Sequence, residues 1–168
     1  MAGERSSVRR PSATLLIGCV LGIVLLGLAS GWLSNSGYGN PWFDALEKPS
    51  FMPPGWAFPV AWTTLYVLLG IVAAITAAAP ESHSRSMGLR LFGAQMLLNF
   101  LWSPIFFGMR EPAIAMGIIA VMLAAAAGAA YHLGKVRPAA GWLMLPYLAW
   151  LCFAAALNWQ ILALNPGA

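Results

Sequence analysis

The chain has 168 residues, of which 60% are hydrophobic and only 8% are charged, and its formal net charge is +4. Soluble domains carry roughly 25% charged residues, so this composition excludes an ordinary soluble protein and indicates an integral membrane protein. The charges fall outside the apolar cores of the long hydrophobic runs, and little sequence is left between those runs. We therefore expect a single membrane domain over residues 1–168, and we interpret the positive charge as a signal of topology rather than of nucleic-acid binding.

Five apolar runs are long enough to cross a bilayer as helices, which takes about 20 residues each. They predict an all-α bundle of five transmembrane helices, at about 13–33, 57–79, 87–107, 112–133 and 140–162. The start of the chain resembles a signal peptide, because Arg9 and Arg10 precede an apolar run that contains Cys19. The run continues to Leu33, beyond the roughly 7–15 residues of a signal sequence, so we predict an uncleaved first helix.

Basic residues predict the orientation of the bundle. The amino-terminal tail and the second and fourth connectors share one side, and they carry Arg5, Arg9, Arg10, Arg85, Arg90, Lys135 and Arg137. The opposite side holds only Lys48 and Arg110. Lys and Arg favour the cytoplasmic side. We expect the amino terminus in the cytoplasm, and the first loop and the carboxyl end outside it.

The segment over residues 40–66 separates the first two helices and is rich in aromatic residues and proline. Trp and Tyr favour the membrane–water interface, and Pro restricts the backbone. We predict a stiff lid over one end of the bundle, with an apolar, flat ligand beneath it. The lid would present Trp42, Phe43, Phe51 and Trp56 at that end.

Uncharged polar residues and aromatic residues recur at helical spacing within the spans. Gln95, Asn99 and Ser103 follow one another at intervals of four on the third predicted helix. Similar spacing relates Trp62 to Tyr66 on the second helix, and Tyr147, Trp150, Ala154 and Asn158 on the fifth. Two interpretations stay open. The polar residues either join helices, with Asn99 bonded to Asn158 or to a carbonyl freed by a proline, or anchor a ligand. Trp62, Trp102 and Trp150 form either an interfacial belt or the walls of a pocket.

Other kinds of site lack the residues that they need. The apolar cores contain no charged residue, which an ion-coupled transporter would require. Cys19 and Cys152 lie in different helices, and His132 has no accompanying ligands, so we predict neither a disulfide nor a metal site. The pairs Gly18–Gly22 and Gly27–Gly31 allow close helix contact, either inside the bundle or between two copies of the chain.

Three motifs together resemble the signature of the TspO/MBR family. They are WFxxLxKPxFxPPxWxxPxxWxxLY over 42–66, QxxLNxxWxPxFFG over 95–108 and PYLxWxxFAxxLN over 146–158. The resemblance implies a five-helix bundle, commonly a homodimer, that binds tetrapyrroles such as protoporphyrin IX and haem, sterols or benzodiazepine-type drugs, without a required cofactor or metal. Carried over by position, the ligand-binding residues are Phe43, Trp62, Tyr66, Asn99, Trp102, Phe106, Trp150, Ala154 and Asn158.

The resemblance leaves the function open among several possibilities. In the first, a binding or transport protein serves tetrapyrrole metabolism, with the macrocycle stacked on Trp62 and Trp150 and its propionates near Lys48 or Arg110. In the second, Trp62 and Trp150 take part in light-dependent porphyrin degradation. A ligand-responsive stress sensor and a sterol-binding protein are further alternatives. Residues 157–162 carry Trp159 where animal members have Tyr and lack a following basic residue, which argues against the animal type of sterol site. The short carboxyl-terminal tail and the Arg-rich start favour a bacterial protein.

Overall fold

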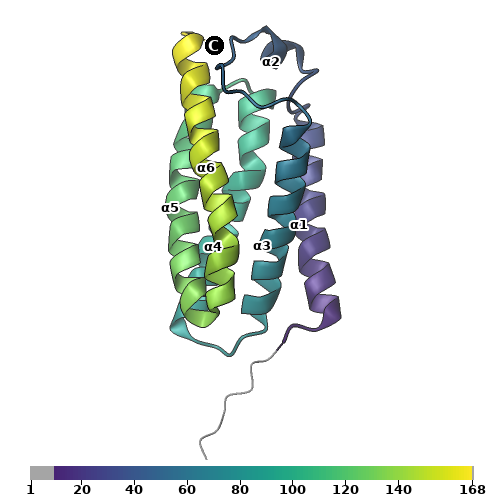
Figure 1. Cartoon of the computed structure of the whole chain (residues 1–168), viewed down its shortest axis with the longest axis vertical. Helices are drawn as coiled ribbons and strands as arrows, with labels where there is room; N and C mark the ends of the chain where they lie inside the picture. The colour runs from purple at the N-terminus through teal and green to yellow at the C-terminus, as the bar shows by residue number, and fades with distance from the viewer. Residues whose placement is uncertain (1–9, 168) are drawn as a thin grey trace, which may run out of the picture.

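The computed structural model describes residues 10–167, and that part of the chain contains helices and no strand. The elements are α1 (Ala13–Leu33), α2 (Pro41–Ala45), α3 (Ala57–Ala77), α4 (His83–Ser103), the π-helical turn η1 (Pro104–Gly108), α5 (Pro112–Val136) and α6 (Pro138–Leu164). With η1 continuing α4, five helices are long and apolar enough to cross a membrane. The predicted all-α architecture is thereby confirmed (Figure 1). Arg5 and Arg9 lie outside the described residues.

The helix ends differ from the predicted bounds by a few residues. α4 begins at His83 rather than near 87, because the side chain of Ser82 accepts a hydrogen bond from the Arg85 amide and caps the helix. α5 and α6 both extend beyond the predicted 133 and 140, and only Arg137 separates them. Apolar patterning marks the stretch that lies in hydrocarbon, whereas a helix can continue into the polar region beyond it.

The connectors that follow α3 and α5 both lie at the end of the bundle opposite the lid, as predicted (Figure 1). At this end Arg85 donates hydrogen bonds to the carbonyls of Thr76 and Ala77, at 3.1 and 2.8 Å. A cation is favourable at a helix carboxyl terminus. Arg85 therefore caps the carboxyl end of α3 and links it to α4. The orientation of this end towards the cytoplasm remains a prediction.

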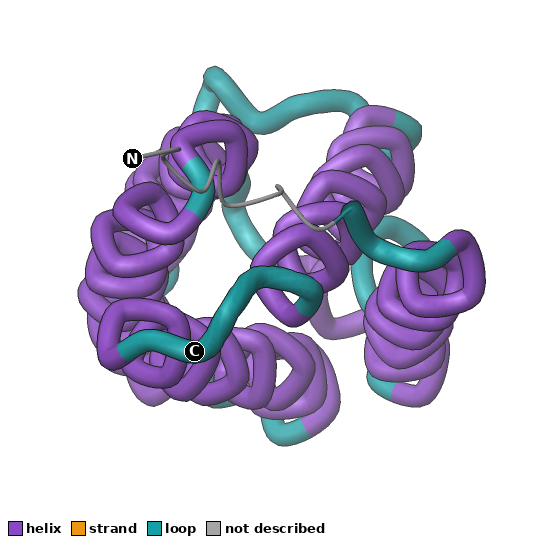
Figure 2. Tube along the Cα trace, turned by 90° about the horizontal axis from the view of Figure 1, so that it is seen from below, coloured by secondary structure: helices purple, strands orange, loops and turns teal. Residues whose placement is uncertain are grey.

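α1 lies at the edge of the bundle and packs chiefly against α3, whereas α5 packs extensively on both α4 and α6 (Figure 2). The close approach of α1 depends on glycine. A Cβ at Gly70 would lie 2.5 Å from the Cα of Val20, and one at Gly27 would lie 2.0 Å from the ring of Tyr66. No atom lies within 4 Å of a Cβ built at Gly22. The contact inside the bundle therefore uses Gly27 rather than the Gly18–Gly22 pair.

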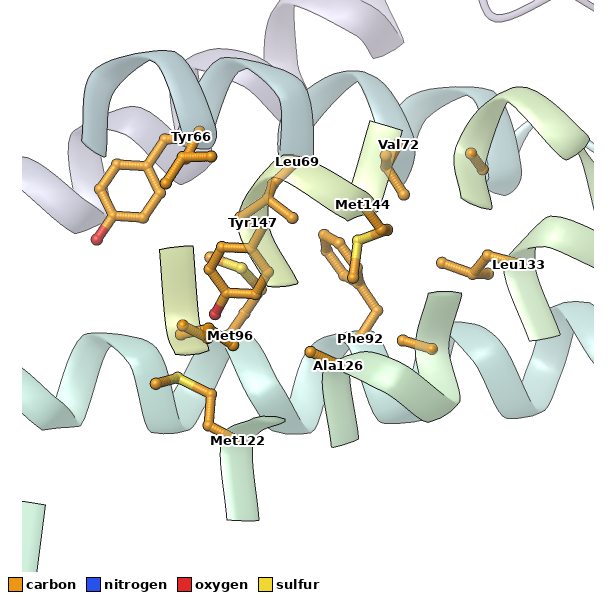
Figure 3. Packing of buried hydrophobic residues seen from close by; sticks show 14 of the residues in the cluster. Tyr66, Leu69, Val72, Phe92, Met96, Met122, Ala126, Leu133, Met144 and Tyr147 are labelled. Atoms are coloured by element: carbon orange, nitrogen blue, oxygen red, sulfur yellow. The ribbon is translucent and has the colours of Figure 1, made fainter. Parts of the chain in front are cut away.

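Apolar side chains of α3, α4, α5 and α6 pack together inside the bundle (Figure 3). Leu69 and Val72 of α3 meet Phe92 of α4 and Met144 of α6, and the last of these is completely buried. Many large hydrophobic residues of the same helices are exposed on the outside, as lipid-facing positions should be. These packed side chains provide a rigid base for the end of the bundle beneath the lid.

Candidate ligand-binding site

A cavity of about 630 Å³ lies beneath the lid, among α1, α3, α4, α5, α6 and η1. Its volume is in the range of pockets that hold small molecules and cofactors. The nine residues that the motifs single out all line it: Phe43, Trp62, Tyr66, Asn99, Trp102, Phe106, Trp150, Ala154 and Asn158. Residues from four separate segments of the chain thus meet around one space.

Two aromatic groups form much of the cavity wall. In one, Trp62 contacts Trp150 edge to face, with ring centroids 6.1 Å apart, and Tyr66 at 5.3 Å. In the other, Trp102 stacks on Phe106 with ring centroids 4.9 Å apart and an angle of 21° between the planes. Phe106 belongs to the π turn η1, a rare geometry that is frequent at functional sites. These flat, apolar walls suit a flat, apolar ligand.

Below the cavity, four uncharged side chains form a continuous hydrogen-bond chain. The Tyr66 hydroxyl donates to Asn99 Oδ1 at 2.9 Å, and Asn99 Nδ2 donates to the Tyr147 hydroxyl at 3.2 Å. Tyr147 in turn donates to Gln95 Oε1 at 2.6 Å. Figure 3 shows that Tyr66 and Tyr147 approach from different helices. The chain joins α3, α4 and α6, and two of its members, Tyr66 and Asn99, also line the cavity.

Asn99 bonds neither to Asn158 nor to a carbonyl freed by a proline, the two partners that the sequence suggested. Asn99 is occupied by the two tyrosines, while Asn158 Nδ2 donates to the Pro112 carbonyl at the start of α5, at 2.9 Å. Asn99 joins α4 to α3 and to α6, whereas Asn158 joins α6 to α5. The interpretation that these polar residues join helices is thus confirmed for Asn99 and Asn158, and both side chains also line the cavity.

Three buried polar atoms of cavity-lining residues have no hydrogen-bond partner within the described part of the chain. They are Nε1 of Trp102, Nε1 of Trp150 and Oδ1 of Asn158. Buried polar atoms are normally paired, because an unpaired one costs free energy. The site can therefore offer a ligand two donors and one acceptor. None of the described residues that line the cavity is charged.

The lid is fastened over the cavity at several points. Asn40 caps α2 by accepting hydrogen bonds from the Trp42 and Phe43 amides. Phe43, only 4% exposed, packs on Phe106 and on Phe107 of η1, with ring centroids 6.3 and 5.2 Å apart. The hydroxyls of Ser36 and Ser103 are hydrogen bonded to each other. The predicted lid thus closes on the bundle through one buried aromatic side chain.

At the carboxyl end of α6, Asn165 holds the lid backbone. Its Oδ1 accepts a hydrogen bond from the Glu47 amide at 2.8 Å, and its Nδ2 donates to the Glu47 carbonyl at 2.9 Å. Nδ2 also donates to the Ile161 carbonyl at 2.8 Å. Residues 118 positions apart are joined in this way, so one side chain ties the lid to the last transmembrane helix.

Neither Lys48 nor Arg110, the alternative partners suggested for ligand propionates, is among the residues that line the cavity. Lys48 Nζ donates to the carbonyls of Phe43, Asp44 and Leu46, at 2.8, 3.1 and 3.1 Å, so its three donors are engaged within the lid. Arg110 follows η1 with φ 61 and is exposed, and neither residue lines the cavity. Lys48 therefore stabilises the end of α2, and its position gives no support to a contact with a bound carboxylate.

Sequence reasoning missed the contributions of α1 and α5 to the wall. Gly27, Ser30 and Gly31 of α1 and Ile119 and Met122 of α5 line the cavity. The small-residue spacing of Gly27 and Gly31 was the available signal for α1, although it indicates packing as readily as a site. Ile119 and Met122 carry no chemical signal, because they are ordinary apolar residues of a membrane helix.

No group of three or more His, Cys, Asp or Glu among the described residues could hold a metal ion. His132 lies near the end of α5 that is opposite the lid, where its ring contacts Tyr131 at 5.2 Å. Cys19 and Cys152 are both free thiols on separate helices.

Comparison with known proteins agrees with these features. The sequence profile described as "TspO/MBR family" matches residues 19–164. The chain is 39% identical over 127 residues to Protein CrtK of Rhodobacter capsulatus, covering 75% of this chain and 79% of that protein. It is 39% identical over 126 residues to the tryptophan-rich sensory protein of Cereibacter sphaeroides, covering 75% and 78%. It is 35% identical over 152 residues to the translocator protein of Sus scrofa, covering 88% and 90%.

Proposed function

Because the chain belongs to the TspO/MBR family, we propose that this integral membrane protein binds a tetrapyrrole such as protoporphyrin IX in the cavity beneath the lid. Binding would serve the transport of tetrapyrroles or their metabolism. The observation that carries the proposal is the convergence of the nine motif residues on one uncharged, aromatic cavity. A planar macrocycle matches the ring faces of the two aromatic groups, and its pyrrole nitrogens match the neutral hydrogen-bonding atoms.

The affinity would come mainly from apolar contact. Each 100 Å² of apolar ligand surface removed from water contributes about 2.5 kcal/mol. Trp62 and Trp150 would supply a large share of this area, since both line the cavity and contact each other. Since the described lining residues carry no charge, the carboxylates of a porphyrin would have to lie at the mouth of the cavity, where water reaches them.

Titration of the purified protein with protoporphyrin IX in detergent, followed by tryptophan fluorescence in the dark, tests the proposal. We expect saturable quenching, and a loss of affinity in the double variant Trp62→Leu/Trp150→Leu. The matched control is Trp142→Leu/Trp159→Leu, which removes two exposed tryptophans of α6 outside the cavity and should bind as the wild type does. Unchanged affinity in a folded Trp62→Leu/Trp150→Leu protein would refute the proposed site.

Light-dependent breakdown of the porphyrin is a second candidate, favoured by the direct contact of Trp62 and Trp150 in the cavity wall. Illumination of the bound porphyrin should then yield a product with a new absorption spectrum. Trp62→Phe or Trp150→Phe should abolish that product, whereas Trp142→Phe should not. Photobleaching equal to that of porphyrin in empty detergent would leave binding without degradation as the function.

A further inference from the structure

A second apolar hollow, of about 440 Å³, lies between α3 and α6. Residues of these two helices alone line it, including Ala61 and Thr64 of α3 and Pro146 and Ala149 of α6. Thr64, Pro146 and Ala149 are exposed on the outside of the bundle. We refer to this hollow as the α3–α6 groove. Because both helices cross the membrane, the groove faces the acyl chains of the bilayer. The Thr64 hydroxyl is satisfied by the Val60 carbonyl at 2.8 Å, as an acyl-chain environment requires.

Trp150 lines both the α3–α6 groove and the cavity beneath the lid. On the cavity side its ring contacts Trp62, with centroids 6.1 Å apart. Phe153, which lines the groove, is 5.5 Å from it. Phe51 of the lid contacts Phe153 in turn, at 6.3 Å. A row of aromatic rings thus leads from the membrane-facing surface to the cavity, and one indole stands between the two spaces.

Trp150 is held by ring contacts with Phe58, Trp62 and Phe153 rather than by hydrogen bonds. Its Nε1 has no hydrogen-bond partner within the described residues, so rotation of the ring would break no hydrogen bond. Its neighbours around the groove and the cavity include Ala61, Ala149 and Ala154, which leave space where larger side chains would fill it. The contact of α3 with α6 is also less extensive than the contacts of α5 with α4 and with α6.

The lid, in contrast, is held by several contacts at once, and the cavity opens beside it, where the exposed residues Trp32 and Tyr38 line the cavity. Phe43 is buried against η1, Lys48 engages three carbonyls of the lid, and Asn165 holds the backbone of Glu47 through two hydrogen bonds. Entry through the lid itself would require several of these contacts to break together. Entry past Trp150 requires the movement of one side chain, whose ring contacts Phe58, Trp62 and Phe153.

We propose that the α3–α6 groove is a membrane-facing entry site for the apolar ligand, and that Trp150 moves aside to admit the ligand to the cavity. The inference rests on the proposed function, because it concerns the route of the same tetrapyrrole. The occupant of the groove is the ligand in transit, which reaches it from the acyl-chain region of the bilayer. The shared residue and the continuous row of rings carry the argument.

Filling the groove without touching the cavity tests the route. Ala149→Phe places a large side chain in the groove from α6, and Thr64→Phe does so from α3; neither residue lines the cavity. The matched control is Ala156→Phe, at an exposed position of α6 that lines neither space. Association and dissociation rates of protoporphyrin IX are measured by stopped-flow tryptophan quenching with the full chain in lipid nanodiscs.

We expect both rates to fall by the same factor, about tenfold or more, with an unchanged Kd. A side chain that obstructs the path raises the free-energy barrier to association and to dissociation, and it leaves the free energies of the free and bound states unchanged. Each tenfold fall in a rate corresponds to 1.36 kcal/mol. The Ala156→Phe protein should keep wild-type rates. Two groove variants are compared, so that the test can still be made if one of them fails to fold.

Several outcomes would overturn the route. Wild-type rates in folded groove variants would exclude it, and faster exchange in Asn165→Ala alone would assign entry to the lid. A changed Kd would make the groove part of the binding site itself. Slower entry together with the loss of a dimer, measured by light scattering, would assign the groove to a second copy of the chain. Absence of saturable binding by the wild type would refute the proposed function, a distinct result.

Discussion

Replacement of Asn165 by Ala should loosen the lid measurably. The substitution removes both hydrogen bonds to Glu47, at 2.8 and 2.9 Å. A typical hydrogen bond contributes about 0.5–1.5 kcal/mol, and exposure places this pair towards the lower end, so the two together contribute about 1–2 kcal/mol. Such a change raises the population of an open lid by a factor of roughly 5–30. Asn165→Asp keeps the acceptor for the Glu47 amide and loses the donor, so its effect should be intermediate.

Amide hydrogen exchange of residues 40–48 reports the opening of the lid, because local opening is read directly as lost protection. The exchange of α3 and α5 in the same sample serves as an internal reference. Gln160→Ala is the matched control, since Gln160 also lies near the end of α6 and has no side-chain hydrogen bond among the described residues. Unchanged exchange of the lid in Asn165→Ala, or an equal increase in Gln160→Ala, would refute the role of Asn165.

Two further predictions concern the floor of the cavity, and thermal unfolding in detergent measures both. Gly27→Ala should destabilise the protein by about 1–3 kcal/mol, because its Cβ would lie 2.0 Å from the Tyr66 ring; Gly22→Ala, with open space around it, should not, and equal effects would contradict the packing. Tyr147→Phe should cost about 1–3 kcal/mol, because it leaves the buried Gln95 Oε1 and Asn99 Nδ2 without a partner. Addition of Gln95→Leu should recover the part of that loss that is due to Gln95, and a purely additive double variant would contradict the hydrogen bond between Tyr147 and Gln95.

The features that depend on local pattern were predictable from the sequence. The apolar runs located the spans, and the spacing of Trp62 with Tyr66 placed both on one helix face, where they line the cavity. The partners of the polar residues were not predictable. Asn99 and Tyr147 are 48 residues apart, and their contact depends on how α4 and α6 pack. Spacing within one helix carries no information on such contacts.

The role of Lys48 shows a second reason why some features of the site could not be predicted from the sequence. A basic residue in an aromatic loop is an attractive partner for a carboxylate, but a short helix also leaves unpaired carbonyls at its end. The structure places Nζ of Lys48 among three such carbonyls of α2 and the residues after it. The choice between the two roles depends on the fold of a nine-residue stretch, 40–48, rather than on the residue type.

The uncharged wall of the cavity bears on how the protein responds to the membrane potential. Moving one elementary charge across the whole membrane is worth about 2.3 kcal/mol per 100 mV. Trp150, Tyr66 and Asn99 carry no charge, so rotation of these side chains would transfer none through the field. De-energising the membrane should therefore leave the opening of the wall unaffected, and any voltage dependence of uptake would reflect the charge on the ligand itself.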